Sequence, residues 1–247
     1  MQDLKPGAEF AGYRIESIER EDAATAVLRA QDPVEGRVVA LHIAAEPPGS
    51  VATVSFLERA HRLRGVAHPH LLPIYDTVSV GGRSLAIAQA PPGRRLDAVL
   101  GDGPHSHEHA TRNASQVASA VEALEGAGAE LPPLTPERVW VNGGQAYLDP
   151  LDGRSLLARG DRPPSAPAAL AGLLDAMLRE ERASPTLRAI AERARDGAYF
   201  SIAQVADALC MADAGAAERA RRRKQIAIAV AVLATLAVIA IVALTLA

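Results

Sequence analysis

The side chains best suited to binding a metal lie between His105 and His109, where the chain reads His-Ser-His-Glu-His. On a helix, the first and last imidazoles are four residues apart and would share one face. The sequence offers no obvious third and fourth ligand. Cys210 is the only cysteine, which excludes a cysteine-based metal site and a disulfide framework. The favoured interpretation is a solvated lead-in to a helix, with metal binding as the alternative.

Asp149 and Asp152 are two carboxylates that lie close together in the sequence, and Asp149 is followed directly by Pro150. This pattern is typical of a tight turn. Arg94 and Arg95 are interpreted as a solvated turn.

The elements that would position these side chains begin with a β-rich region. The turn residues 32–36 separate two short runs of β-branched residues, and Ser50 is a suitable cap for the helix that follows. In that helix Val54, Leu57 and His61 are expected to form the buried stripe. The predicted elements are strands within residues 13–44, a helix over 51–66, and strands over 75–80 and 84–90.

After a hinge-like Pro91-Pro92-Gly93, the periodicity changes from two to about 3.6 residues. Asn142-Gly143 predicts a hairpin, and Trp140 beside it is interpreted as a core residue. The remaining predictions are helices over 110–127, 168–182, 185–195 and 202–211, and a flexible connection over 159–167. We therefore expect an α+β fold with a β-rich lobe over residues 1–92 and a shortened, mostly helical lobe over 93–213.

Residues 226–247 are apolar except for Thr235 and Thr245. At about 1.5 Å per residue this stretch reaches about 33 Å, enough to cross a hydrocarbon core of about 30 Å. A basic segment over 214–225 precedes it, and its five cations are Arg219, Arg221, Arg222, Arg223 and Lys224. By the positive-inside rule these cations are a topology signal. We expect a single-pass anchor in the cell (inner) membrane, with the soluble domain in the cytoplasm.

Charge further limits the class of protein. The chain has 29 acidic and 26 basic residues, and all of the acidic residues lie at or before Glu218. The part that precedes the basic segment is therefore clearly acidic. An acidic body of this kind is not expected to bind nucleic acid.

Several segments then carry a family resemblance through their order and spacing. They are Gly12–Ile15, Arg37–Ile43, His68–Asp76, Gln116–Val121, Ala169–Leu178 and Tyr199–Ser201. The third reads HPHLLPIYD, which is very similar to "HPNIVPIYD", and the second resembles the strand that normally reads "VALK". Together, over about residues 10–211, they resemble a bacterial Hanks-type serine/threonine protein kinase domain. The resemblance implies a bilobal protein-kinase-like fold.

The resemblance also implies where the catalytic groups would lie, and these positions are degenerate. Phosphoryl transfer needs a glycine-rich turn, a lysine, metal-binding side chains and a catalytic aspartate. The glycine-loop positions fall on Arg20, Asp22 and Thr25. The lysine and its glutamate partner fall on His42 and Arg59, and the catalytic-loop aspartate, lysine and asparagine fall on Pro133, Thr135 and Arg138. Asp149 stands where "DFG" would begin, so the resemblance implies a weak candidate for a metal ligand there. Asp152 competes for this role, and a tight turn explains both residues equally well. One carboxylate without its asparagine partner is a weak magnesium site.

These substitutions indicate a membrane-anchored pseudokinase that serves as a protein-binding, scaffolding or regulatory module in signalling. No cofactor is expected, and residual binding of ATP or Mg²⁺ is disfavoured. The expected partners are the lipid bilayer and a protein, such as a true kinase or a membrane-associated signalling protein. Two alternatives remain: a weakly active or atypical serine/threonine kinase, and a small-molecule or nucleotide sensor that uses the degenerate cleft.

Overall fold

The computed structural model describes residues 4–21, 25–103, 105–151, 164–182, 185–212 and 214–215. Across these ranges, no helix is both long enough and apolar enough to cross a membrane. The predicted span over 226–247 and its basic flank over 219–224 lie outside the described residues, as do Asp22 and Asp152. The anchor and its orientation therefore stay predictions.

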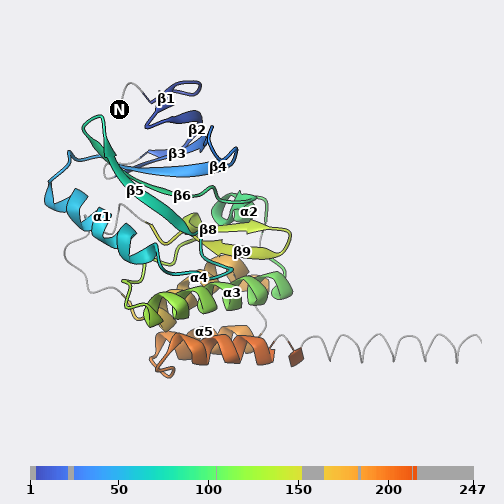
Figure 1. Ribbon diagram of the computed structural model, residues 1–247. Helices are drawn as coiled ribbons and strands as arrows, with labels where there is room; N and C mark the ends of the chain where they lie inside the picture. The colour runs from blue at the N-terminus through green and yellow to red at the C-terminus, as the bar shows by residue number, and fades with distance from the viewer. Residues whose placement is uncertain are drawn as a thin grey trace, which may run out of the picture.

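The first lobe is an antiparallel sheet with one helix packed against it (Figure 1). The strands follow the order β1-β2-β3-β4-β6-β5 across the sheet. Their bounds are β1 Glu9–Phe10, β2 Tyr13–Glu21, β3 Thr25–Gln31, β4 Val38–Ala44, β5 Ile74–Val80 and β6 Arg83–Gln89. The β-rich first lobe that the sequence predicts is thus present, with strands close to the expected positions.

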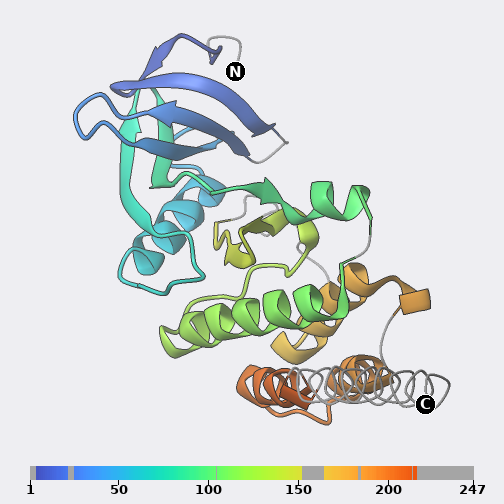
Figure 2. The ribbon, with the colours of Figure 1, turned by 90° about the vertical axis from the view of Figure 1, so that its right-hand side faces the viewer.

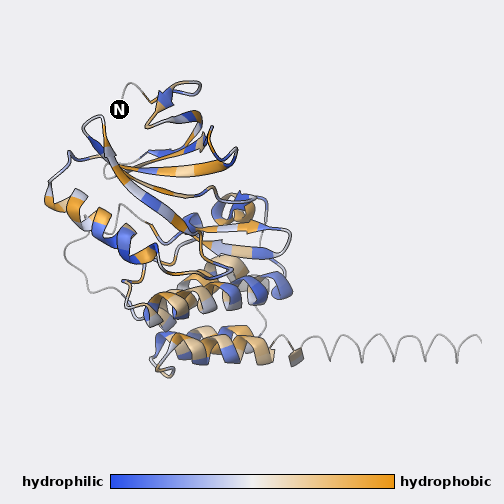
Figure 3. Cartoon of the chain, viewed as in Figure 1, coloured by the Kyte–Doolittle hydropathy of each residue, from blue (hydrophilic) through white to orange (hydrophobic). Residues whose placement is uncertain are grey.

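Strand β4 is buried along nearly its whole length because both faces of the sheet are covered there. Val39, Leu41 and Ile43 belong to a core on one face, where Leu4 also packs, and Ala40 and Ala44 belong to the larger core on the other. Alternation along the strand places His42 on the same face as those two alanines. Figure 3 colours β4 as hydrophobic over most of its length, as burial on both faces requires.

Helix α1 (Val51–Leu63) starts at the predicted cap, where the Ser50 hydroxyl accepts a hydrogen bond from the Thr53 amide at 3.2 Å. The predicted buried stripe is correct for Leu57, which is partly buried against the core, and wrong for Val54 and His61. Val54 is 43% exposed and His61 is exposed, whereas Phe56 and Arg59 are buried. Phe56 offers more apolar area than valine, and the helix therefore turns this face to the core.

The second lobe is mostly helical, with a small three-stranded sheet between the helices and the first lobe (Figures 1 and 2). Its strands are β7 Arg94–Arg95, β8 Val139–Asn142 and β9 Gln145–Leu148. Its helices are α2 Leu96–Gly101, α3 His107–Gly126, the short 3₁₀ helix Pro136–Arg138, α4 Ala166–Arg182 and α5 Pro185–Arg195, and residues 202–212 are also helical. Helix α4 begins two residues before its predicted start, inside the predicted connection over 159–167.

The β8–β9 hairpin turns at Gly143 and Gly144, one residue later than predicted. Their φ angles of 57° and 83° are the left-handed values that a tight two-residue hairpin turn needs. The hairpin also joins the two lobes, because the Leu148 amide donates to the His70 carbonyl at 2.8 Å and the Leu72 amide donates to the Leu148 carbonyl at 3.0 Å. The two lobes are therefore connected by backbone hydrogen bonds as well as by the hinge.

Candidate functional site

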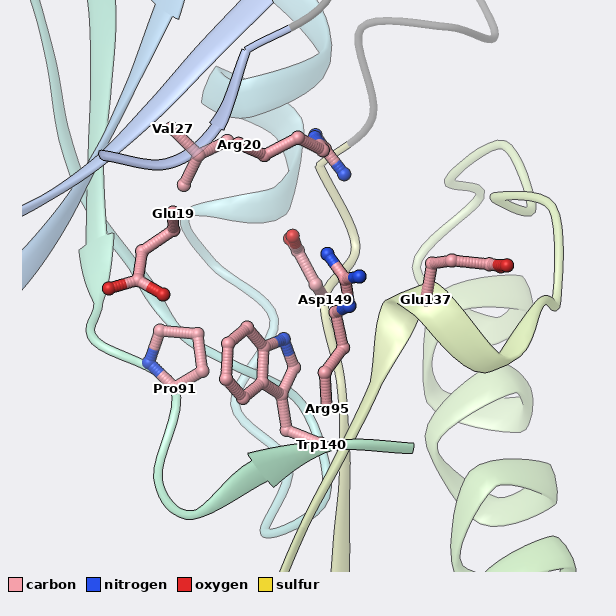
Figure 4. A pocket seen from close by; sticks show the side chains of 8 residues that line it. All are labelled: Glu19, Arg20, Val27, Pro91, Arg95, Glu137, Trp140 and Asp149. Carbon is pink, nitrogen blue, oxygen red and sulfur yellow. The ribbon is translucent and has the colours of Figure 1, made fainter. Parts of the chain in front are cut away.

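A small cleft lies between the two lobes, under β2 and β3 and above β8 (Figure 4). The side chains that line it are Glu19, Arg20, Val27, Pro91, Arg95, Glu137, Trp140 and Asp149. The volume of this cleft is about 20 Å³. That is room for about one water, whereas clefts that bind drug-sized ligands measure about 300–1,000 Å³.

A cross-strand row forms the upper side of this cleft. Arg20 pairs with Val27, Val27 pairs with His42, and His42 pairs with Ala86 on four neighbouring strands. Residues directly opposite in a sheet share a face, so Arg20, at an expected glycine-loop position, and His42, at the expected lysine position, lie on one face with Val27 between them. Thr25, the third glycine-loop position, is also buried. This row presents arginine and valine side chains to the cleft, whereas a phosphate-binding turn presents exposed backbone amides.

His42, at the expected lysine position, is 3% exposed. Burial lowers the pKa of the His42 imidazole, Asp149 opposes this shift, and Arg20 and Arg138 add to it. The imidazole is therefore neutral near pH 7. A neutral ring cannot supply the positive charge that a lysine would give to a phosphate.

Arg59, at the expected glutamate position, is buried in α1 and contacts the second lobe. Its Nη2 donates to the Glu130 carbonyl at 3.1 Å, and its Nη1 lies 3.9 Å from the Glu130 carboxylate. Glu58, the adjacent acidic residue, is exposed. The helix therefore carries a buried cation, and no carboxylate, at this position, and the contact of that cation is with Glu130.

Arg138, at the expected position of the metal-binding asparagine, is also buried. It forms a reciprocal pair with Asp149: Arg138 Nη1 donates to the Asp149 carbonyl at 3.1 Å, and the Asp149 amide donates to the Arg138 carbonyl at 2.9 Å. The Asp149 Oδ1 accepts the Leu151 amide at 3.0 Å. The Asp149 carboxylate thus closes a turn beside a guanidinium, as the tight-turn interpretation expects.

The other two catalytic-loop positions have no group for proton transfer. Pro133 is exposed, and its carbonyl accepts the Thr135 amide at 3.1 Å. The Thr135 carbonyl in turn accepts the Arg138 amide at 3.0 Å, which starts the short 3₁₀ helix. This loop keeps a folded backbone without an acid or a base in its expected place.

The interpretation of Arg95 as a solvated turn is wrong. Arg95 lies in β7 opposite Trp140, and both side chains line the cleft, with the indole half-buried beside Pro91 (Figure 4). Arg95 donates two hydrogen bonds of 2.6 Å to Asp97, and these lower the pKa of the Asp97 carboxyl. The Arg-x-Asp spacing is a local signal that could have predicted the Arg95–Asp97 ion pair. The position of Arg95 in the cleft depends instead on the pairing of β7 with β8, which no local pattern predicts.

The histidine segment packs beside the β8–β9 turn. The rings of His105 and His109 are 6.0 Å apart, and His105 Nε2 lies 3.1 Å from the Asn113 amide nitrogen. Together with the Gly143-Gly144 turn, these side chains line a second hollow with a volume of about 140 Å³. Among the described residues, no three or more His, Cys, Asp or Glu side chains are grouped to hold a metal ion.

Comparisons with known proteins concern the sequence and the fold. No family model matches the chain. The serine/threonine-protein kinase PknE of Mycobacterium tuberculosis and that of Mycobacterium bovis are each 29% identical over 150 residues, which is 59% of this chain and 26% of the relative. The chain thus matches only about a quarter of the length of these curated relatives.

Solved structures have the same fold. The kinase domain of Mycobacterium tuberculosis PknI superposes with a TM-score of 0.69 at 18% identity, covering 86% of this chain and 99% of that one. Rad53 1–466 in complex with AMP-PNP gives a TM-score of 0.57 at 14% identity, covering 76% of this chain and 54% of that one. The fold is therefore bilobal and protein-kinase-like. With the sequence matches, it defines a kinase-like domain homologous to bacterial serine/threonine kinases.

Proposed function

We propose that this chain is a membrane-anchored pseudokinase that binds a protein partner as a scaffold or regulator and does not transfer phosphate. The observation that carries the proposal is the joint replacement of the lysine, base and metal-ligand positions by His42, Pro133 and Arg138. Each replacement removes a different requirement of phosphoryl transfer, namely phosphate contact, acceptance of the hydroxyl proton and metal binding.

The electrostatics of the cleft support the proposal. Mg²⁺ takes up several oxygen ligands, usually with one or two carboxylates among them. The buried guanidinium of Arg138 donates to the Asp149 carbonyl, and Arg20 lines the same cleft as Asp149. Two cations close to the one candidate ligand repel a divalent cation. The space of about 20 Å³ also excludes a nucleotide from this arrangement of the lobes.

Membrane attachment gives such a domain a means of action without catalysis. The apolar residues 226–247 would hold the domain at the cell membrane, and the basic residues 219–224 would keep it on the cytoplasmic side. Confinement to a surface raises the effective concentration of the domain near membrane proteins. The proposed partner is such a protein, for instance an active kinase or another membrane-associated signalling protein.

A transfer assay tests the absence of catalysis. The full-length chain, solubilised in mild detergent, is incubated with radiolabelled ATP, Mg²⁺ and a generic protein substrate, beside an active kinase as positive control. We expect no transfer above background, and no nucleotide-dependent rise in melting temperature. Robust transfer that disappears in Asp149→Ala would overturn the proposal and establish an atypical kinase. A rise in melting temperature with nucleotide and without transfer would indicate a sensor instead.

Crosslinking in intact membranes tests the binding role. The complete chain and a form that ends before residue 214 are crosslinked and captured under the same conditions. We expect a discrete partner with the complete chain and a marked loss of it without the anchor. Equal capture by both forms would remove the role proposed for the membrane.

Topology is tested by moving the charges. Replacing Arg221, Arg222 and Arg223 by neutral residues and placing three arginines after Ala247 should invert or scramble the orientation. Protease protection of the folded domain measures the outcome. A domain that stays fully accessible from the cytoplasmic side would refute the signal role of the cluster.

A further inference from the structure

Arg59 connects the two lobes at a point where kinase-like chemistry would instead need a carboxylate. It is 4% exposed, lies on α1 of the first lobe, and hydrogen-bonds through Nη2 to the Glu130 carbonyl of the second lobe. A buried guanidinium is costly unless its donors are satisfied. A rotation that separates α1 from residue 130 would break this hydrogen bond, and the Arg59 guanidinium would lose the Glu130 carbonyl as an acceptor.

On the side of the second lobe, Arg138 and Asp149 fix the turn that follows β9 through reciprocal hydrogen bonds. Both residues belong to the second lobe, so these bonds do not cross the lobe boundary. Burial lowers the pKa of Arg59, while Glu130 and, more weakly, Asp149 oppose that shift. The buried Arg59 guanidinium is therefore stabilised mainly by Glu130, which lies in the second lobe.

We infer that Arg59 acts as an arginine latch that, through its hydrogen bond to the Glu130 carbonyl, holds the two lobes in one arrangement without a nucleotide or a divalent cation. The latch uses a guanidinium group of the chain itself and needs no ligand. The consequence is a surface of constant shape, set by the fold and independent of ligand. This inference does not depend on the proposed scaffolding role, because it concerns only how the lobes are held.

Backbone amides that join the lobes report directly on the latch. The amides of Leu72 and Leu148 donate across the lobe boundary, so each opening of the boundary exposes them to hydrogen exchange. Hydrogen bonds to a charged group contribute about 1.5–3 kcal/mol, so we expect Arg59→Gln to speed exchange of these amides by about 10- to 100-fold. The matched control is Arg62→Gln, which removes an exposed arginine from the same helix. We expect it to leave the exchange rates unchanged.

A distance measurement gives an independent readout on the full-length chain in mild detergent. Spin labels are placed at Val34→Cys in the first lobe and Phe200→Cys in the second, which are 91% and 92% exposed, with Cys210→Ser as background. We expect one narrow distance distribution that Mg²⁺ with AMP-PNP does not alter. We expect Arg59→Gln to broaden it and Arg62→Gln to leave it narrow.

Two results would overturn the latch. One is a distribution in Arg59→Gln as narrow as in the parent, together with unchanged exchange at Leu72 and Leu148. The other is a shift of the parent distribution when Mg²⁺ and AMP-PNP are added. Should Arg59→Gln fail to fold, Arg59→Lys keeps the charge but loses the guanidinium fork. An exchange rate equal to that of the parent in Arg59→Lys would count equally against the latch.

Discussion

Replacing His42 with lysine restores the side chain that active kinases carry at this position, yet we expect the change to destabilise this protein. The position is 3% exposed and faces Arg20 and Arg138, with Asp149 as the opposing charge. Burial already lowers the pKa of the imidazole, which means that the site favours a neutral group. A lysine would bring a charge that the imidazole does not carry near pH 7.

The magnitude follows from the burial of the ammonium group. Full burial shifts a lysine pKa by up to about 3–5 units, and each unit corresponds to about 1.4 kcal/mol. Attraction between the ammonium group and Asp149 offsets part of this burial cost, but Arg138 is already hydrogen-bonded to Asp149. We therefore expect a loss of about 2–4 kcal/mol in the free energy of unfolding. For a domain of this size that lowers the melting temperature by about 5–15 °C.

The assay is thermal and urea denaturation of the parent, His42→Lys and His42→Met at about pH 7.5 and about pH 9.5. The penalty of the lysine should shrink at the higher pH because the ammonium loses its proton more readily there. Methionine, which is neutral, should show no such pH dependence. The reasoning is refuted if His42→Lys is as stable as the parent near neutrality. A melting temperature of His42→Lys that rises with MgATP would refute it too, since the cleft would then lack only its lysine.

Three further predictions concern stability and are measured by the same denaturation assays. Because burial lowers the pKa of His42 below its ordinary value near 6.5, the unfolded chain binds more protons in acid. The melting temperature should therefore fall as the pH drops below about 6.5, and His42→Met should reduce that fall. Gly93→Ala should lower the free energy of unfolding by more than about 2 kcal/mol, because φ is 75° and the added Cβ would lie 2.2 Å from a backbone oxygen of β8. Gly172→Ala should raise it by about 0.4–1 kcal/mol, because this position in α4 has open space for a Cβ. Ser50→Ala should lose about 0.5–2 kcal/mol and Ser50→Asp nearly nothing, because only the first removes the cap; equal effects of the two would contradict this role.

Local patterns predicted most of the elements because their physical causes are local. Helix α5 occupies the predicted residues 185–195, and β5 and β6 lie within a residue of their predicted positions. Turn residues between β-branched runs and an apolar stripe at helical spacing are readable from neighbours a few positions apart. The residue types at the positions that the resemblance assigns to catalytic groups could likewise be read from the sequence, since a proline side chain at position 133 offers no base.

Sequence alone did not predict which face of α1 is buried. Val54 and His61 have helical spacing but are exposed, and Phe56 and Arg59 are buried instead. The choice depends on what α1 packs against. The Arg59 guanidinium finds its acceptor at Glu130, 71 positions later in the chain, and no local pattern records that contact.

The sequence by itself thus determined the type and order of most elements, the residue types at the positions that the resemblance assigns to catalytic groups, and the predicted membrane segment. Each of these depends on residue type, on short-range periodicity or on the resemblance. The tertiary structure alone decided what those residues contact. It brought Arg20 and Arg95 to one interlobe cleft with a free space of about 20 Å³, and it placed Arg59 against Glu130 and Arg138 against the Asp149 carbonyl. Burial and hydrogen bonding depend on the partners that packing of the two lobes brings together, and those partners lie far apart in the chain.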